Sequence, residues 1–138
     1  MTVFFGSAAP GRASAAAQRY MADRTSTASP QELVGMLFDA ALANIKLGSA
    51  ALESGDRYEA NRRYLKAQDI VLELRSSLNR EAGPLAEQLD AIYAWVFQHL
   101  VTAAVNSDRS AALAAAREAL RCLEPIVAAW AEATRGSR

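Results

Sequence analysis

Cysteine, histidine and clustered glycines are scarce in this chain of 138 residues, and their scarcity excludes several kinds of site. One cysteine, Cys122, cannot form an intramolecular disulfide and fits a reducing compartment. One histidine, His99, cannot supply the Glu-x-x-His pairs of a di-iron bundle. The seven glycines do not gather into a phosphate-binding loop. The sequence therefore predicts no metal site, no cofactor and no catalytic residue, and so a protein that is not an enzyme.

An excess of charge is also lacking, because 15 basic residues balance 15 acidic ones without a long run of either sign. This balance gives no electrostatic footprint for nucleic acid or for an anionic membrane. The longest apolar run, AIYAWVF, is far shorter than the ~20 residues that span a bilayer. The first residues, MTVFFGSAAPGR, lack the basic start of a secretory signal. We therefore expect a cytoplasmic protein that neither binds nucleic acid nor inserts into a membrane.

What the chain does contain is alanine and apolar residues at helical spacing. Apolar residues make up 51% of the sequence and aromatic residues only 7%, which favours helices over a sheet. The apolar pattern predicts helices at about residues 30–54, 57–81, 85–105 and 109–133. Helices of this length joined by short turns pack antiparallel to their neighbours. The predicted fold is all-α: an antiparallel up-down four-helix bundle over residues 29–134, preceded by a mobile N-terminal segment.

That N-terminal segment, residues 1–28, shows no sustained apolar period and is predicted to be a flexible tail. Its second half, SAAAQRYMADR, has enough alanine to form a short docking helix, although alone such a helix would be marginal.

The stretch TSTASPQELVGMLFDAAL gives a strong signal for the start of the first helix. Ser29 is a typical N-cap, Pro30 suits the first helical position, and Glu32 completes a capping box with Ser29. Near the other end of the chain, Pro125 lies inside the last predicted helix, where we expect a kink or a loosened turn.

More apolar side chains are present than the inner stripes of four helices require. The first helix carries a second apolar row beside its inner one, formed by Val34, Phe38, Leu42 and Ile45. The second helix carries Leu65 and Leu72 off its inner stripe. These residues either fill a large core or form a groove for a partner's amphipathic segment. The pattern alone leaves both interpretations open.

His99 raises a second functional hypothesis, because a four-helix bundle with one helical histidine suggests a histidine phosphotransfer domain. Such a domain requires a small residue and a lysine soon after the histidine, to admit and neutralise the phosphate. Here the sequence continues His99-Leu100-Val101-Thr102-Ala103-Ala104, without a lysine. A polar residue on the third helix is the simpler interpretation.

Two ordered motifs resemble the flagellar secretion chaperone family (FliS). The first follows an upstream tyrosine and the second lies on the second predicted helix; the matching residues are Tyr20, Thr27-Ala28-Ser29-Pro30, Glu32-Leu33, Met36-Leu37 and Asp39, then Lys66-Ala67-Gln68, Ile70, Glu73-Leu74 and Leu78-Asn79. The chain departs from the family pattern at Phe38, where a tyrosine is usual, and at Ala40, where a glycine is usual.

The resemblance implies a cytoplasmic export chaperone that binds the disordered C-terminal segment of flagellin one-to-one. It would prevent premature polymerisation and keep flagellin competent for flagellar type III secretion, without ATP. Another type III export client, and an export-gate component as second partner, remain open. In the same family the N-terminal segment can cover part of the binding site, a role that residues 15–24 suit here.

With this function in view, we assign Leu33, Met36 and Leu37 to the core, and the second apolar row of the first helix to a partner groove. The residues predicted to bind the partner are Tyr20, Phe38, Leu42, Lys66, Gln68, Asp69 and Leu72. For Lys66 and Gln68, the alternative is that they brace a neighbouring helix.

Overall fold

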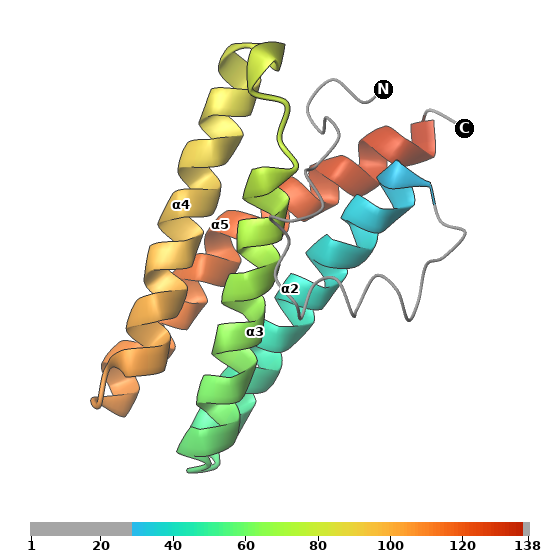
Figure 1. Cartoon of the computed structure of the whole chain (residues 1–138). Coiled ribbons are helices and arrows are strands. Elements are labelled where there is room, and N and C mark those ends of the chain that lie inside the picture. The colour runs from blue at the N-terminus through green and yellow to red at the C-terminus, as the bar shows by residue number, and fades with distance from the viewer. Residues whose placement is uncertain (1–28, 137–138) are drawn as a thin grey trace.

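The computed structural model describes residues 29–136, and this part contains helices and turns but no strand. Along the chain lie α2 (Pro30–Glu53), α3 (Arg57–Ser76), the short 3-10 helix η2 (Arg80–Ala82), α4 (Pro84–Val105) and α5 (Arg109–Gly136) (Figure 1). The all-α prediction is confirmed. The predicted tail, with Tyr20 and the docking helix, lies outside the described residues.

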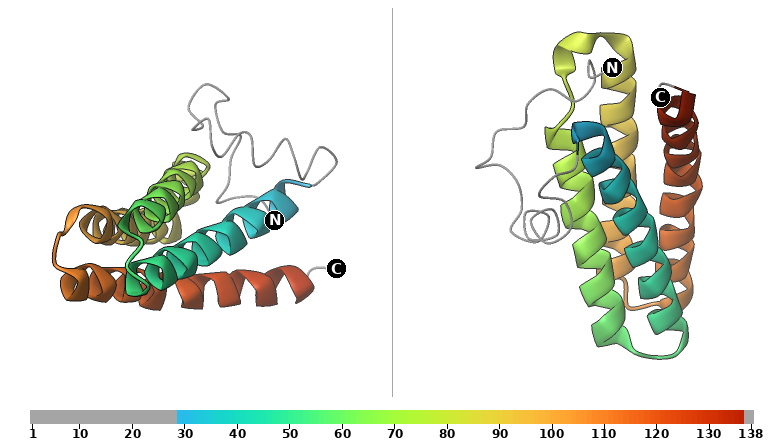
Figure 2. Two further views of the ribbon diagram at one scale, coloured as in Figure 1. Left: turned by 90° about the horizontal axis from the view of Figure 1, so that it is seen from below. Right: turned by 90° about the vertical axis from the view of Figure 1, so that its right-hand side faces the viewer.

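Each helix packs against the next one along the chain, and α5 returns to pack against α2 (Figure 2). Short connections join consecutive helices, so that neighbours run in opposite directions, as an up-down bundle requires. Nine large side chains fill the centre with almost no exposed surface: Tyr64, Tyr93, Phe38, Ile45, Leu74, Leu100, Leu123, Val71 and Val96.

The start of α2 is as predicted. The Ser29 hydroxyl accepts a hydrogen bond from the Glu32 amide at 3.1 Å, and a Glu32 carboxylate oxygen accepts one from the Ser29 amide at 2.9 Å. Pro30 occupies the first turn, where its missing N–H has no helical acceptor. The capping box therefore fixes the residue at which the bundle begins.

The end of α4 at Val105 is as predicted, whereas the ends of α3 and α5 differ from the predicted ones. α3 ends at Ser76 instead of residue 81, because the Asn79 side chain accepts from the Glu81 amide and starts the separate helix η2. α5 continues past residue 133 to Gly136, and it runs without a break through Pro125, which lies on its exposed face.

One described helix, α2, is long and apolar enough to cross a membrane by length and composition alone. Many of its apolar side chains, however, are buried in the bundle, among them Val34, Leu37, Ile45 and Leu52. This burial is typical of the core helix of a bundle.

Candidate functional site

The second apolar row of α2, which was predicted to line a partner groove, is largely buried in the structure. Phe38 is only 1% exposed, and its ring packs edge-on against Trp130 of α5 with centroids 5.9 Å apart. Val34 and Ile45 of the same row are also buried, whereas Leu42 is half-buried. Because α5 covers this side of α2, the row belongs to the core; contact of Phe38 or Leu42 with a partner stays a prediction.

The predicted inner row of α2 is correspondingly less buried than expected at its start. Leu37 is buried, but Leu33 and Met36 are half-buried. Periodicity placed two apolar rows on α2, and both are largely buried, because α2 packs against α3 and also against α5.

Gln68 of α3 braces a neighbouring helix, as the alternative interpretation proposed. The side chain is buried, and its Nε2 donates to the backbone oxygen of Leu100 on α4 at 3.2 Å. Lys66 is half-buried, and the described residues form no ion pair with it within 4.0 Å. Gln68 thus has a structural role that is independent of any partner.

The described surface of α3 carries an exposed apolar row, which we call the α3 row: Tyr58, Leu65 and Leu72. Leu65 is 54% exposed and Leu72 is 42% exposed, and Tyr58 is more exposed than either. The three residues follow one another at intervals of seven, so they lie on one side of the helix two turns apart. Such a row matches the apolar stripe of a partner helix.

Two carboxyl groups lie beside the α3 row. Asp69 lies three residues before Leu72 and so on the same side of the helix, and Glu73 lies one turn after Asp69, on the flank of the row. Glu73 is only 5% exposed, and its Oε1 atom has no hydrogen-bond partner among the described residues. Burial raises the pKa of Glu73 and also the pKa of Asp69 above their ordinary values.

Sequence reasoning named Asp69 but not Glu73 as a site residue. Glu73 does belong to the second family motif, but nothing in its spacing distinguishes a buried carboxylate from a solvated one. Its burial comes from the tertiary structure.

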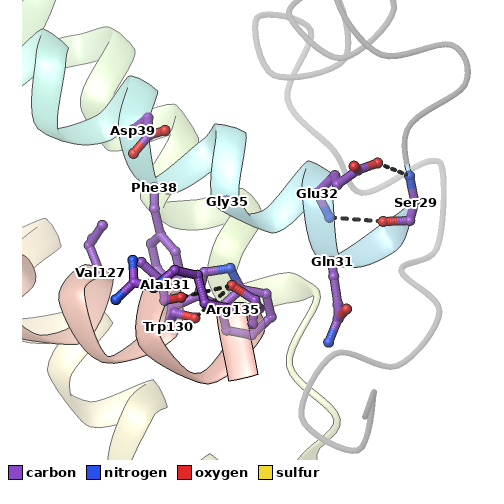
Figure 3. A pocket seen from close by; sticks show the side chains of 11 residues that line it. Ser29, Gln31, Glu32, Gly35, Phe38, Asp39, Val127, Trp130, Ala131 and Arg135 are labelled. Carbon is purple, nitrogen blue, oxygen red and sulfur yellow. Dashed lines mark hydrogen bonds between the residues drawn. The ribbon is translucent and has the colours of Figure 1, made fainter. Parts of the chain in front are cut away.

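A pocket of 410 Å³ opens between the start of α2 and the end of α5 (Figure 3). Phe38 and Trp130 meet at its apolar side, and the capping box of Ser29 and Glu32 lies at its edge. Gly35 faces it, and a methyl group there would meet Trp130 Nε1 at 3.5 Å, an ordinary contact. The other lining residues are Gln31, Asp39, Val127, Ala131, Thr134 and Arg135.

The side chain of His99 on α4 interacts with a neighbouring aromatic residue. Its ring stacks on Trp95 with centroids 3.6 Å apart, and its Nδ1 lies 2.9 Å from the Trp95 backbone oxygen. Among the described residues, no three potential metal ligands lie close enough together to hold an ion.

Comparison with known proteins identifies a family and two relatives. The family described as Flagellar protein FliS matches residues 12–137. The Flagellar secretion chaperone FliS of Bacillus subtilis (strain 168) is 35% identical over 89 residues, which cover 64% of this chain and 66% of that protein. The protein of the same name from Vibrio cholerae serotype O1 is 34% identical over 84 residues, 60% of this chain and 62% of that protein. Each alignment thus spans slightly less than two thirds of the relative's own length.

The resemblance drawn from the two motifs is therefore confirmed. So is the prediction that the chain is not an enzyme, because the matched relatives are named as chaperones. This also removes support from the phosphotransfer hypothesis for His99. With a family match over nearly its whole length, the chain belongs to the FliS family of flagellar proteins.

Proposed function

We propose that this chain is a cytoplasmic chaperone of flagellar secretion that binds the disordered C-terminal segment of flagellin one-to-one. By covering that segment it prevents premature polymerisation and keeps flagellin competent for type III export. The observation that carries the proposal is the α3 row, in which Leu65 and Leu72 stay about half exposed on a helix whose other side is packed in the core. Family membership supplies the class of client.

The α3 row suits a segment that folds as it binds. An amphipathic helix laid along the row would bury apolar side chains at every second turn. Ordering the segment costs part of the interaction free energy, so the apolar contacts have to exceed that cost. Burial of the exposed half of each leucine contributes roughly 1 kcal/mol.

A calorimetric titration with the C-terminal segment of the same organism's flagellin, about 40 residues long, tests the proposal. We expect saturable one-to-one binding with a large negative heat-capacity change, because apolar surface is buried. Absence of heat at concentrations of tens of micromolar would contradict the proposal.

Leucine variants locate the binding surface. The double variant Leu65→Ala/Leu72→Ala should weaken binding roughly 10- to 30-fold, since each truncation removes about 1 kcal/mol. Leu47→Ala is the matched control, because Leu47 is 47% exposed but lies on α2. Equal losses in the double variant and in the control would rule out the α3 row as the binding surface.

We also propose that the N-terminal tail regulates client binding by covering part of the binding site. Deletion of residues 1–24, which include Tyr20, should leave a folded bundle with altered client affinity, because the capping box at Ser29 starts the bundle independently. Circular dichroism checks the fold and the same titration checks affinity. Loss of helical signal in the truncated chain would contradict this part.

The same titration can test for a different client and for a second partner. A different type III export client is distinguished from flagellin by titrating the corresponding segments in competition. An export-gate component, as second partner, would bind the preformed complex without releasing the client.

A further inference from the structure

Glu73 is the one nearly buried carboxylate among the described residues, and nothing in the described chain compensates its charge. The side chain is 5% exposed, and Oε1 has no hydrogen-bond partner there. Asp69 lies one turn earlier on α3. The cations nearest to them in sequence are Lys66, three residues before Asp69, and Arg75, two residues after Glu73. Arg75 pairs with Asp90 of α4 at 2.9 Å, and no described ion pair or hydrogen bond joins Lys66 or Arg75 to either carboxylate.

Such an arrangement is unfavourable for the chaperone on its own. Withdrawing a carboxylate from water without a counter-charge costs free energy, and buried polar atoms in native proteins are nearly always paired. The pKa values of both carboxyl groups are raised by loss of hydration alone, without an opposing effect of any cation. Two neighbouring carboxyl groups therefore lack a positive partner within the described chain.

The position of the two carboxyl groups indicates what supplies that partner. Both lie within one helical turn of Leu72, and Asp69 lies between the two exposed leucines. A segment that packs on the α3 row therefore passes beside Asp69, and Glu73 lies one turn after Asp69 on the flank of the row. A long side chain with its charge at the tip can lay its methylene groups on the leucines and still reach a recessed carboxylate.

We propose that Glu73 and Asp69 receive a lysine or arginine side chain of the client segment that packs on the α3 row. This inference rests on the proposed function and specifies the chemistry of the client: an amphipathic segment with a basic residue at the edge of its apolar stripe. Arginine fits two carboxylates best, because its planar guanidinium can donate to both.

The isosteric variant Glu73→Gln separates this role from a structural one. Removing an uncompensated carboxylate should raise the melting temperature of the free chaperone, while affinity for the flagellin segment falls about tenfold, as for the loss of one charged hydrogen bond. The salt dependence of binding should weaken as well, because one ion pair is lost. A residue that only supports the fold would lower both melting temperature and affinity, and that result would overturn the inference.

Two further variants complete the test. Asp69→Asn should cause a smaller loss of affinity, because Asp69 is more exposed than Glu73 and its ion pair is better screened. Glu87→Gln is the matched control: it removes one exposed carboxylate from α4 and should change affinity less than twofold. If Glu73→Gln behaves like Glu87→Gln, the inference is wrong.

Client variants identify the basic residue. Each lysine or arginine of the flagellin segment is changed to glutamine in turn and titrated against the wild-type chaperone and against Glu73→Gln. A double-mutant cycle should show coupling for one basic residue and none for the others. Wild-type binding that depends on Leu65 and Leu72 but shows no coupling at Glu73 would overturn the inference and leave the proposed function intact. Absence of wild-type binding would overturn both.

Discussion

The two halves of α3 place their carboxyl groups in opposite surroundings. In the first half, Glu59 accepts hydrogen bonds from Arg62 at 2.9 Å and from Arg63 at 2.8 Å, and these bonds lower its pKa to about 2. In the second half, Glu73 has no described donor at Oε1, and burial raises its pKa. The two residues share one helix, so the difference arises from their neighbours.

The apolar contacts of α3 differ between the side that packs against α2 and the side that carries the α3 row. The Tyr64 ring is fully buried against Gly48 of α2, and its hydroxyl lies 2.9 Å from the Ser49 hydroxyl. Further along α3, Leu65 and Leu72 remain exposed. The exposed α3 row runs along both halves, with Tyr58 and Leu65 in the first and Leu72 in the second, whereas the two carboxyl groups that we assign to a partner lie in the second half.

The largest expected effect comes from disturbing the packing of Tyr64 of α3 against α2. A methyl group at Gly48 would lie 2.8 Å from the Tyr64 ring, and the ring is fully buried. Gly48→Ala should therefore destabilise the bundle by about 1–2 kcal/mol, because overpacking outweighs the better helix propensity of alanine. Urea unfolding measures the change.

Gly35→Ala is the control for that substitution, since both glycines lie on α2. Its methyl group meets nothing closer than 3.5 Å, so the variant should be more stable than the wild type by up to about 1 kcal/mol. Equal effects at the two positions would show that Tyr64 moves aside, and that this half of α3 is packed less tightly than its contacts indicate.

An intermediate effect on stability is expected from a change of pH, and its sign should differ between variants of Glu73 and of Glu59. A raised folded pKa gives stability that is present below the ordinary value of 4.5 and is lost as pH rises above it. Glu73→Gln should therefore match the wild type near pH 4 and exceed its melting temperature by a few degrees near pH 7. Thermal unfolding at several pH values measures this difference, and a difference that does not change with pH would contradict the raised pKa.

The smallest expected effect is that of Glu59→Gln. The lowered pKa of Glu59 gives stability above pH 4.5 that is lost as pH falls toward about 2. The variant should therefore be slightly less stable than the wild type near neutral pH and equal to it at strongly acidic pH. Because the ion pairs are solvent-accessible, added salt should shrink the difference. A loss that is insensitive to salt would indicate a role in packing instead.

Most of the fold could be predicted from interactions between residues that lie close together in the sequence. The capping box of Ser29 and Glu32 was predictable because its hydrogen bonds connect residues three apart. The four helices were predictable from apolar spacing, and the family from two motifs within that pattern. The end of α3 could not be predicted in this way. Helix propensity allows α3 to continue, but the Asn79 side chain accepts from the Glu81 amide and starts η2 instead.

The candidate site was predicted less well, and for a different reason. Phe38 and Leu72 are both apolar residues beside an inner stripe, and nothing in the apolar pattern distinguishes them. In the folded chain, Phe38 packs against Trp130 and is buried, whereas Leu72 remains exposed. Gln68 and Glu73 likewise look like surface residues by composition, yet both are buried.

The sequence by itself thus determined where the helices begin, how many there are and to which family they belong, because these properties depend on residues close together in the chain. Tertiary structure alone decided which apolar row became core, which leucines stayed exposed and which carboxylate lost its water. Those properties depend on which helix packs against which, and burial is a property of the neighbours that a side chain acquires on folding.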